Sequence, residues 1–387
     1  MIKTDASKSN PIEKNSRNEG GRKMEIKAAV VSETSGDFNI EQLEISDPNE
    51  NEVLVRIAGT GICHTDLAAR DQHLPVPLPS VFGHEGAGVV EKAGSKVAKV
   101  KPGDHVVLSF GSCGTCSSCK SGHDTACFNF FPLNFSGSRL DGSTTLRKGD
   151  QVIHGSFFCQ SSFADYALAN ERNVVKVRED IPIEMLGPLG CGVQTGTGAV
   201  MNSLHPQAGA SIAIFGTGSV GISAILGAVV CGCTTIIAVD LNADRLELTK
   251  ELGATHTVNA GEVDPVEAIQ EITGGGAEFT LECVGDSKVL RQAVDALTLR
   301  GVCGLVGAAP GGMEVNLDMQ TLLNSRTVMG IIEGEAISDL FIPKLLDLHS
   351  QWRLPFDRMV KYYPFDEINQ AVEDMENGKV IKPILRP

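Results

Sequence analysis

The stretch Ser211-Ile-Ala-Ile-Phe-Gly-Thr-Gly-Ser-Val-Gly221 decides the fold of the C-terminal half of the chain. Its first five residues predict a buried strand, and its glycines allow a tight turn into a helix of small residues, Ile222–Val230. A second strand, Thr235–Val239, is predicted to lead into Asp240, 19 residues after the third glycine. A Gly-x-Gly-x-x-Gly motif in this setting predicts a dinucleotide-binding turn. The alternative is a glycine-rich turn in an unrelated α/β domain.

The same turn predicts how a dinucleotide would be held. Glycines let the backbone approach a pyrophosphate at the helix N-terminus, and Asp240 is placed to accept a hydrogen bond from a ribose 2′-hydroxyl. Because a carboxylate would repel the 2′-phosphate of NADP, we expect NAD as the cofactor. The turn residues predicted to contact it are Gly216, Gly218, Ser219, Val220 and Gly221.

Four more predicted strands follow, and helical patterns alternate with them. The strands are His256–Asn259, Phe279–Val284, Val302–Val306 and Val328–Ile332. The helices are Ala243–Leu252, Pro265–Thr273, Ser287–Ala296 and Leu317–Ser325, and two more at Leu340–Leu348 and Glu367–Asn377 belong to a tail. Six strands in one βα series predict a doubly wound parallel Rossmann sheet of the α/β class. We expect the tail to pack back onto the first half of the chain.

The first half of the chain has a different pattern, with short strands separated by glycine-rich turns. The predicted strands are Ile26–Val31, Glu52–Ile57, Gly88–Ala93, His105–Phe110 and Ala164–Ala169. This pattern predicts a β-rich, barrel-like domain. We therefore expect a disordered polar extension over 1–23, one domain from 24–196 and 336–387, and a Rossmann domain from 197–335.

Length and composition agree with a two-domain enzyme. The chain has 387 residues and a formal charge of −15, which disfavours nucleic acid and anionic membranes as partners. It contains no apolar run of about 18 residues and no secretory h-region at its start, so we expect a cytoplasmic protein. The cysteines number eleven, an odd count that argues against a disulfide framework and for reduced thiols.

Four of the cysteines form a cluster with two, two and seven residues between successive members. They are Cys113, Cys116, Cys119 and Cys127. Such spacing lets one loop surround a tetrahedral ion, and four thiolates leave no position for water, so the cluster predicts a structural zinc site. An iron–sulfur cluster is the competing interpretation, although the wide last spacing departs from the ferredoxin pattern.

A second metal site is predicted from residues that are farther apart. Cys63 and His84 offer a thiol and an imidazole, and Asp66 and Glu85 offer carboxylates that could be ligands or their neighbours. Cys191, in Leu-Gly-Cys-Gly, supplies a third ligand. Three protein ligands with one open position are typical of catalytic zinc. The alternative is a buried cysteine and a core histidine. A zinc Lewis acid beside a dinucleotide predicts hydride transfer between an alcohol and the nicotinamide ring.

These motifs carry a family resemblance that covers residues 24–387. Gly61-Ile-Cys-His-Thr-Asp66, Gly83-His-Glu-Gly-Ala-Gly88, the four-cysteine cluster and the glycine turn with Asp240 occur in the order found in zinc-containing medium-chain alcohol dehydrogenases. The chain most resembles their aryl, or benzyl-type, members. The resemblance implies a GroES-like fold for the β-rich domain, two zinc ions per chain, NAD, and a homo-oligomer, either dimer or tetramer.

The resemblance also implies roles for residues near the predicted catalytic zinc. Cys63, His84 and Cys191 would bind it, and Glu85 would lie beside it as a neighbour or transient ligand. Asp66 would orient His84 through its other ring nitrogen. The remaining role concerns the proton: Thr65 would hydrogen-bond the substrate hydroxyl and pass its proton towards the ribose.

Three more residues are implied to meet the cofactor. His64 and Lys382 would contact the pyrophosphate, and Arg245 would lie near the adenosine ribose. The chain departs from the family at two positions. Ala68 replaces a relay histidine found in many members, and Lys382 stands where arginine is common, which removes a bidentate donor.

The expected substrates are primary aromatic or allylic alcohols and their aldehydes. A Gly/Ser-rich segment with six phenylalanines, 128–158, together with Phe110, suggests an apolar pocket over the zinc, although the segment is equally well explained as a surface loop. A glutathione-dependent formaldehyde dehydrogenase is the nearest rival because it shares every motif. A rival of another class is a non-catalytic NAD-binding scaffold.

Overall fold

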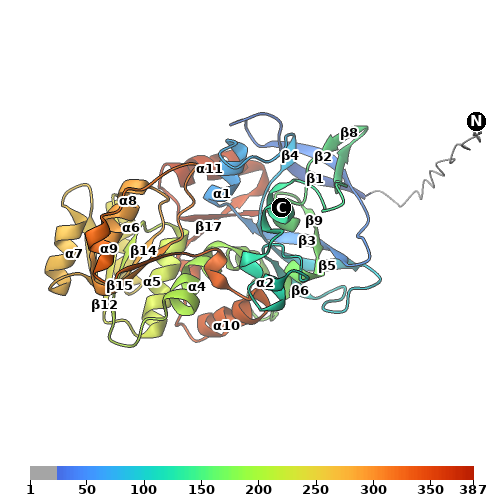
Figure 1. Ribbon diagram of the computed structural model, residues 1–387. Coiled ribbons are helices and arrows are strands. Elements are labelled where there is room, and N and C mark those ends of the chain that lie inside the picture. The colour runs from blue at the N-terminus through green and yellow to red at the C-terminus, as the bar shows by residue number, and fades with distance from the viewer. Residues whose placement is uncertain (1–23) are drawn as a thin grey trace, which may run out of the picture.

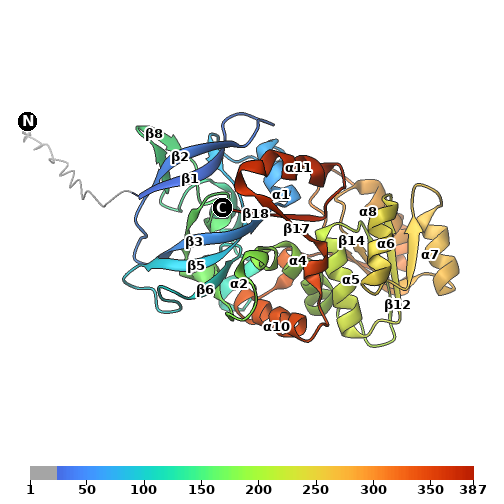
Figure 2. The same cartoon turned by 180° about the vertical axis from the view of Figure 1, so that it is seen from behind.

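The computed structural model describes residues 24–387, which form two lobes joined side by side (Figures 1 and 2). One lobe holds the parallel sheet and its helices, and the other holds the β-rich part with both ends of the described chain. The extension predicted over 1–23 lies outside the described residues. Within 24–387, no helix is long and apolar enough to cross a membrane.

The doubly wound sheet predicted from the glycine turn is confirmed. Its strands are β11 (Ser211–Phe215), β12 (Thr235–Asp240), β13 (His256–Asn259), β14 (Ala277–Glu282), β15 (Leu297–Leu305) and β16 (Thr327–Gly330). Its helices are α5 (Ser219–Cys231), α6 (Ala243–Glu251), α7 (Pro265–Thr273), α8 (Ser287–Asp295) and α9 (Met319–Leu323). All six strands are parallel, in the order β13-β12-β11-β14-β15-β16. This order places a ligand crevice at the carboxyl ends of β11 and β14, where the winding reverses.

The turn that opens this sheet has the conformation expected from its glycines. Gly216 has a φ of +89°, which disfavours residues with a side chain. A Cβ atom on Gly221 would collide with the carbonyl oxygen of Gly216, so α5 can pack closely on β11 only with glycine there. The helix N-terminus therefore points at the crevice.

The β-rich lobe contains two sheets. The first joins β4 (Ser80–Val81), β1 (Met24–Val31), β2 (Asn39–Ile45), β7 (Leu146–Lys148) and β8 (Gln151–Ile153) in that order. The second joins β10 (Val174–Lys176), β6 (His105–Leu108), β5 (Glu85–Ala93), β3 (Glu52–Gly61), β18 (Lys382–Arg386) and β17 (Val360–Pro364), with β9 (Tyr166–Asn170) also paired to β3. The five strands predicted here correspond to β1, β3, β5, β6 and β9, with shifted ends.

The tail packs back onto the first lobe, as predicted. Its helices are α10 (Ser338–Ser350) and α11 (Ile368–Glu376), close to the expected ranges. The strands β17 and β18 were not predicted. Because β18 pairs antiparallel with β3, the last residues of the chain become part of the sheet that carries the metal-site loops.

The segment 128–158 is more ordered than the predicted irregular loop. It contains α3 (Phe130–Phe135), the hairpin of β7 and β8, and the start of the short helix η2 (Phe157–Cys159). Packing of the phenylalanines of segment 128–158 against one another orders this segment, and turn composition alone does not reveal such packing.

Other short helices of the chain are α1 (His64–Arg70), α2 (Ser117–Lys120), η1 (Asp124–Ala126), η3 (Glu171–Asn173), η4 (Ile183–Met185), η5 (Gly187–Gly190), η8 (Phe356–Met359) and η9 (Phe365–Glu367).

The chain crosses between the two lobes twice. The first crossing is the helix α4 (Gly192–Gly198), which continues into the π-helical η6 (Ala199–Leu204), so the boundary expected after residue 196 falls inside a continuous helical stretch. The second is the short helix η7 (Glu333–Glu335), between β16 and α10. The two crossings lie against each other, because the amide of Asn202 donates to the carbonyl oxygen of Gly334.

Candidate active site

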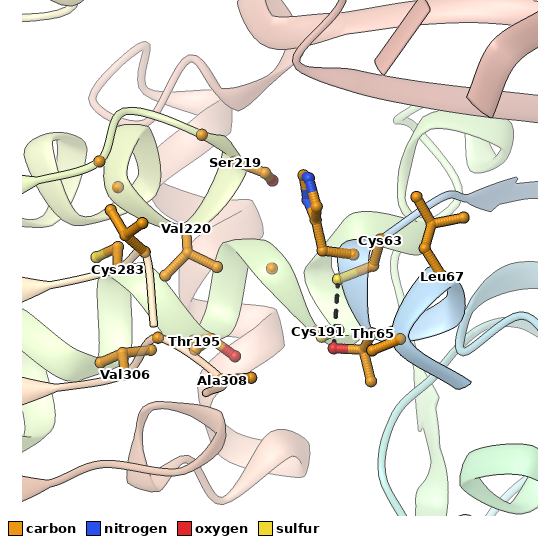
Figure 3. Close-up of a pocket in the computed structure, with 18 of the residues that line it drawn as sticks. Cys63, Thr65, Leu67, Cys191, Thr195, Ser219, Val220, Cys283, Val306 and Ala308 are labelled. Atoms are coloured by element: carbon orange, nitrogen blue, oxygen red, sulfur yellow. Dashed lines mark hydrogen bonds between the residues drawn. The ribbon is translucent and has the colours of Figure 1, made fainter. Parts of the chain in front are cut away.

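The first metal-site residues lie where β3 ends and α1 begins. Cys63 directly precedes α1 with an extended backbone, and its amide donates to the Asp66 carboxylate at 2.9 Å. This bond closes the first turn of the helix, as acidic residues do near helix N-termini. The sequence Cys-His-Thr-Asp thereby directs Cys63 and Thr65 towards the same space, with their Sγ and Oγ1 atoms 3.8 Å apart (Figure 3).

The predicted catalytic ligands are brought together. The ligand atoms of Cys63, His84, Glu85 and Cys191 all lie within 4.8 Å of one another. His84 Nε2 lies 3.2 Å from Cys191 Sγ, and His84 Nδ1 lies 2.8 Å from Asp66 Oδ1, the contact predicted for Asp66. Two thiols, an imidazole and an adjacent carboxylate form the donor set that catalytic zinc takes, so these residues fit that ion.

The electrostatics of this cluster suit a cation. A hydrogen bond from Cys191 lowers the pKa of Cys63 well below its usual value, and the same bond raises the pKa of Cys191. Burial opposes protonation of His84, but the Asp66 carboxylate and the Cys63 sulfur together offset burial and raise the pKa of the imidazole well above its usual value. A metal ion that binds both sulfurs must displace the thiol protons.

Lys382 lines the cavity, and its predicted contact with the pyrophosphate stays a prediction. Its ammonium is 1% exposed and lies 2.9 and 2.8 Å from the two carboxylate oxygens of Glu85 and 2.9 Å from the carbonyl oxygen of Ile62. These three acceptors can use all three ammonium hydrogens. β18 brings Lys382 into the interior beside β3, which pairs its charge with the fully buried Glu85.

The four-cysteine cluster folds as one loop around a common point. The ligand atoms of Cys113, Cys116, Cys119 and Cys127 lie within 4.8 Å of one another. Backbone amides donate to three of the sulfurs, as in the bond from the Cys116 amide to Cys113 Sγ at 3.4 Å. Hydrogen bonds from Thr115 lower the pKa of Cys113 to about 5. Such bonds favour thiolates, so the loop fits a closed tetrahedral metal site.

The side chains of Cys63, His84, Glu85 and Cys191 together form the metal cluster. A cavity of about 1100 Å³ lies between this cluster and the glycine turn. Figure 3 shows Cys63, Thr65 and Cys191 on one side of it and Ser219, Val220 and Cys283 on the other. Among the predicted cofactor residues, Gly216, Gly218, Ser219, Val220, Gly221, Asp240, Arg245 and the exposed His64 all line this cavity.

Two polar atoms at the cavity wall indicate a ligand. Ser219 Oγ and Arg245 Nε are buried and have no hydrogen-bond partner in the described part of the chain. Buried polar groups are rarely left unsatisfied unless a ligand or water completes them. Asp240 is already held, because its carboxylate accepts bonds from the Thr217 amide at 2.6 Å and from the Thr217 hydroxyl at 2.7 Å. The residues present therefore fit a dinucleotide.

Phenylalanines form the wall of the cavity next to the metal cluster. Phe130, Phe131, Phe135 and Phe158 line it, and the Phe158 ring stacks on His84 with centroids 4.5 Å apart. Ala68 lines it too, so no imidazole occupies the relay position.

Phe110, which was predicted to line the substrate pocket, is buried and is not among the described residues that line the cavity. It packs behind Phe130 instead, with ring centroids 6.0 Å apart. α3, which the sequence patterns did not predict, places Phe130 in front of it.

Glu333 is a site residue that the sequence patterns did not reveal. It is 8% exposed and lines the cavity, and burial raises the pKa of its carboxyl to about 7. Its carboxylate accepts from Gln194 and Thr195, each at 3.2 Å. The only signal in the sequence was its place directly after the last predicted strand, at the edge of a parallel sheet where ligands bind.

The fold and the site define a class of protein: a two-domain dehydrogenase with a zinc site facing a dinucleotide turn. The chain matches the zinc-binding dehydrogenase family over residues 219–350 and the alcohol dehydrogenase GroES-like domain over residues 49–179. It is 46% identical to the geraniol dehydrogenase of Castellaniella defragrans over 365 residues, which is 94% of this chain and 98% of that one. The chain belongs to the zinc-dependent alcohol dehydrogenases, oxidoreductases for which zinc and a nicotinamide cofactor are characteristic.

Solved structures agree with this family. An alcohol dehydrogenase zinc-binding domain protein from Burkholderia ambifaria is 52% identical, with a TM-score of 0.93 over 94% of this chain and 99% of that one. Benzyl alcohol dehydrogenase from Acinetobacter calcoaceticus is 48% identical, with a TM-score of 0.91 over the same shares. The predicted family and its two-domain fold are thus confirmed.

Proposed function

We propose that this enzyme interconverts primary aromatic or allylic alcohols and their aldehydes, with NAD as the hydride carrier. The observation that carries the proposal is the aromatic wall of Phe130, Phe131, Phe135 and Phe158 beside the metal cluster, in one cavity with the glycine turn. The two named relatives, a geraniol and a benzyl alcohol dehydrogenase, support an unsaturated alcohol as substrate.

The residues of the metal cluster would act as follows. Zinc held by Cys63, His84 and Cys191 would supply a Lewis acid that favours loss of the alcohol proton. Asp66 keeps His84 Nε2 directed at the site through its bond to Nδ1. Glu85 stays beside the ligands, neutralised by Lys382.

Proton movement and water exclusion fall to other side chains. Thr65 Oγ1 would accept the hydroxyl proton and pass it to the cofactor ribose. Because Ala68 offers no further acceptor, the proton would leave through the ribose and water or through His64 at the rim. The phenylalanine wall keeps water from the reacting carbon, which strengthens the electrostatic interactions in the cavity.

The cofactor residues support NAD over NADP. Ser219 would donate to the pyrophosphate, and Arg245 would lie beside the adenosine ribose, since both have unpartnered buried atoms on the cavity wall. Asp240 would meet the ribose hydroxyls and repel a 2′-phosphate. In this scheme residues 197–335 form the NAD-binding domain, and 24–196 with 336–387 form the catalytic domain, whose four-cysteine loop binds a structural zinc.

A panel of alcohols and cofactors tests this function. With NAD, kcat/KM for benzyl alcohol and geraniol should exceed that for ethanol by at least about a hundredfold, because each buried methylene contributes roughly 1 kcal/mol. NADP should support little turnover. Higher kcat/KM for ethanol would refute the substrate class, and a preference for hydroxymethylglutathione would favour the formaldehyde dehydrogenase instead. No turnover at all would favour a scaffold.

The outer part of the aromatic wall should select for long substrates. Phe131 is 68% exposed yet lines the cavity, whereas Phe128, 73% exposed, does not. Phe131→Ala should lower kcat/KM for geraniol about tenfold, by roughly 1.5 kcal/mol of lost apolar contact, and should change that for benzyl alcohol less than about threefold. Phe128→Ala is the matched control and should change neither. Equal losses with both alcohols would show that Phe131 does not contact the distal chain.

We also infer a homo-oligomer that forms through the edge of the parallel sheet. Among the strands of residues 24–387, β16 pairs only with β15, and the neighbouring Leu299, Met319 and Leu323 are 65%, 84% and 76% exposed. An open strand edge flanked by apolar side chains is a surface that pairs with another copy. A monomer in sedimentation velocity at micromolar concentration would refute this.

All eleven cysteines are unpaired, which supports the proposed cytoplasmic location.

A further inference from the structure

The second crossing between the lobes, η7, has an unusual backbone. Glu333, Gly334 and Glu335 have φ values of +50°, +63° and +48°, so three successive residues adopt the left-handed conformation. For residues with a side chain this conformation costs about 1 kcal/mol or more and persists where surrounding contacts hold it. Here Ser203 Oγ donates to the Glu335 carboxylate at 2.8 Å, and Asn202 holds the Gly334 carbonyl.

This backbone directs Glu333 inwards, onto the first turn of α4. Its Oε2 atom accepts from Gln194 Nε2 at 3.2 Å and from Thr195 Oγ1 at 3.2 Å. Its Oε1 atom lies 3.8 Å from Cys191 Sγ. All three contacts fall within the stretch 191–195, which contains a zinc-ligand cysteine and, at Thr195, a residue lining the cavity beside Val220 (Figure 3). One carboxylate therefore ties together the start of α4.

The contacts continue from Gln194 to the other side of the metal cluster. Gln194 Nε2 also lies 2.7 Å from the Gly190 carbonyl oxygen and 2.8 Å from Ser109 Oγ. Gln160 donates from one amide group to the backbone oxygens of Ser109 at 3.3 Å and His84 at 2.9 Å. A buried polar network thus runs from Glu333 to the backbone of His84 and to the residue before Cys191.

We propose that Glu333 is a positioning residue for hydride transfer, which sets the side chain of Thr195 and the first turn of α4 that presents Cys191. Loss of a residue that orients a metal ligand through hydrogen bonds typically lowers metal affinity or activity by about 10-fold to 100-fold. Glu333 performs this role through the hydrogen bonds that its Oε2 atom accepts. The proposal rests on the dehydrogenase function proposed above only for its kinetic readout.

The geometry separates a hydrogen-bonding role from a role for charge. Both bonds end on Oε2, so Glu333→Gln with its amide oxygen at that position keeps them, whereas Glu333→Ala removes them. We expect kcat to fall about tenfold in Glu333→Ala, with alcohol KM within about twofold, and to fall less than about threefold in Glu333→Gln. Glu247→Ala, which removes a 68% exposed carboxylate paired with Lys250 on α6, is the control and should retain kcat.

A double-mutant cycle tests whether Glu333 acts through Thr195. Thr195→Val removes the hydroxyl that donates to Glu333, so the losses in kcat should not multiply when both residues are changed. The double variant with Glu333→Ala should stay within about twofold of the more impaired single variant. Multiplied losses would show that the two residues act independently and would overturn the proposal.

A spectroscopic measurement tests the role without turnover. Cobalt in place of the catalytic zinc gives visible bands that depend on the geometry of its sulfur ligands, so Glu333→Ala should shift them while Glu247→Ala leaves them unchanged. Unshifted bands together with unchanged kcat in Glu333→Ala would overturn the proposal, as would equal losses in Glu333→Ala and Glu333→Gln. If the wild-type protein oxidises no alcohol, the proposed function fails, and the cobalt bands still decide the role of Glu333.

Discussion

Cys63→Ser is expected to abolish alcohol oxidation while NAD binding survives. Cys63 is one of the three proposed zinc ligands, together with His84 and Cys191, and its pKa is held well below the usual thiol value, as a metal ligand requires. A serine hydroxyl does not supply a thiolate. Since a metal Lewis acid contributes several kcal/mol to the transition state, kcat/KM should fall by at least about a thousandfold.

Three measurements separate this result from general damage to the protein. Metal analysis should find about two zinc ions per wild-type chain and one in Cys63→Ser, because the four-cysteine loop is unchanged. Titration by NADH fluorescence should give a Kd within about twofold of wild type, since the glycine turn lies across the cavity. Cys231→Ser alters a thiol outside both clusters and should keep full activity. Retention of more than a tenth of the activity in Cys63→Ser would remove zinc from the chemistry.

The nucleotide-binding half of the fold could be predicted almost strand by strand. Parallel strands buried on both faces read as continuous apolar runs, and the turn after β11 needs glycine for a steric reason visible in the sequence. The strands of the β-rich half were harder to predict from the sequence. β18 joins the sheet by pairing with β3, more than three hundred residues earlier, and no local pattern signals a partner so distant.

The same distinction explains which site residues could be predicted. Cys63 and His84 could be identified in the sequence because their side chains are metal ligands at a characteristic spacing, and the structure brings them together. Glu333 and Lys382 depend on where the chain returns to the site, so Glu333 was missed and the buried pairing of Lys382 with Glu85 was not predicted. Their roles follow from burial and tertiary contacts, which residue type alone does not report.

Lys382→Met should be the most destabilising single substitution near the site. Lys382 and Glu85 are 1% and 0% exposed, and the ammonium lies 2.8 and 2.9 Å from the two carboxylate oxygens. Removing the lysine leaves a buried carboxylate with one remaining bond, from the Gly192 amide at 3.1 Å. Breaking a buried ion pair from one side typically costs about 3–5 kcal/mol. Urea denaturation of the zinc-loaded enzyme should show the loss as a lower midpoint.

A second variant decides whether unpaired charge is the cause. Replacing a whole buried ion pair by neutral groups is often close to neutral in stability, so Lys382→Met combined with Glu85→Gln should recover most of the lost midpoint. Lys148→Met breaks the pair with Glu41 at the surface, where the lysine side chain is 52% exposed, and should cost less than about 1 kcal/mol. If the double variant is as unstable as Lys382→Met, the unpaired charge of Glu85 is not the cause of the instability. Packing of the lysine stem then holds β18 against the metal-site loops.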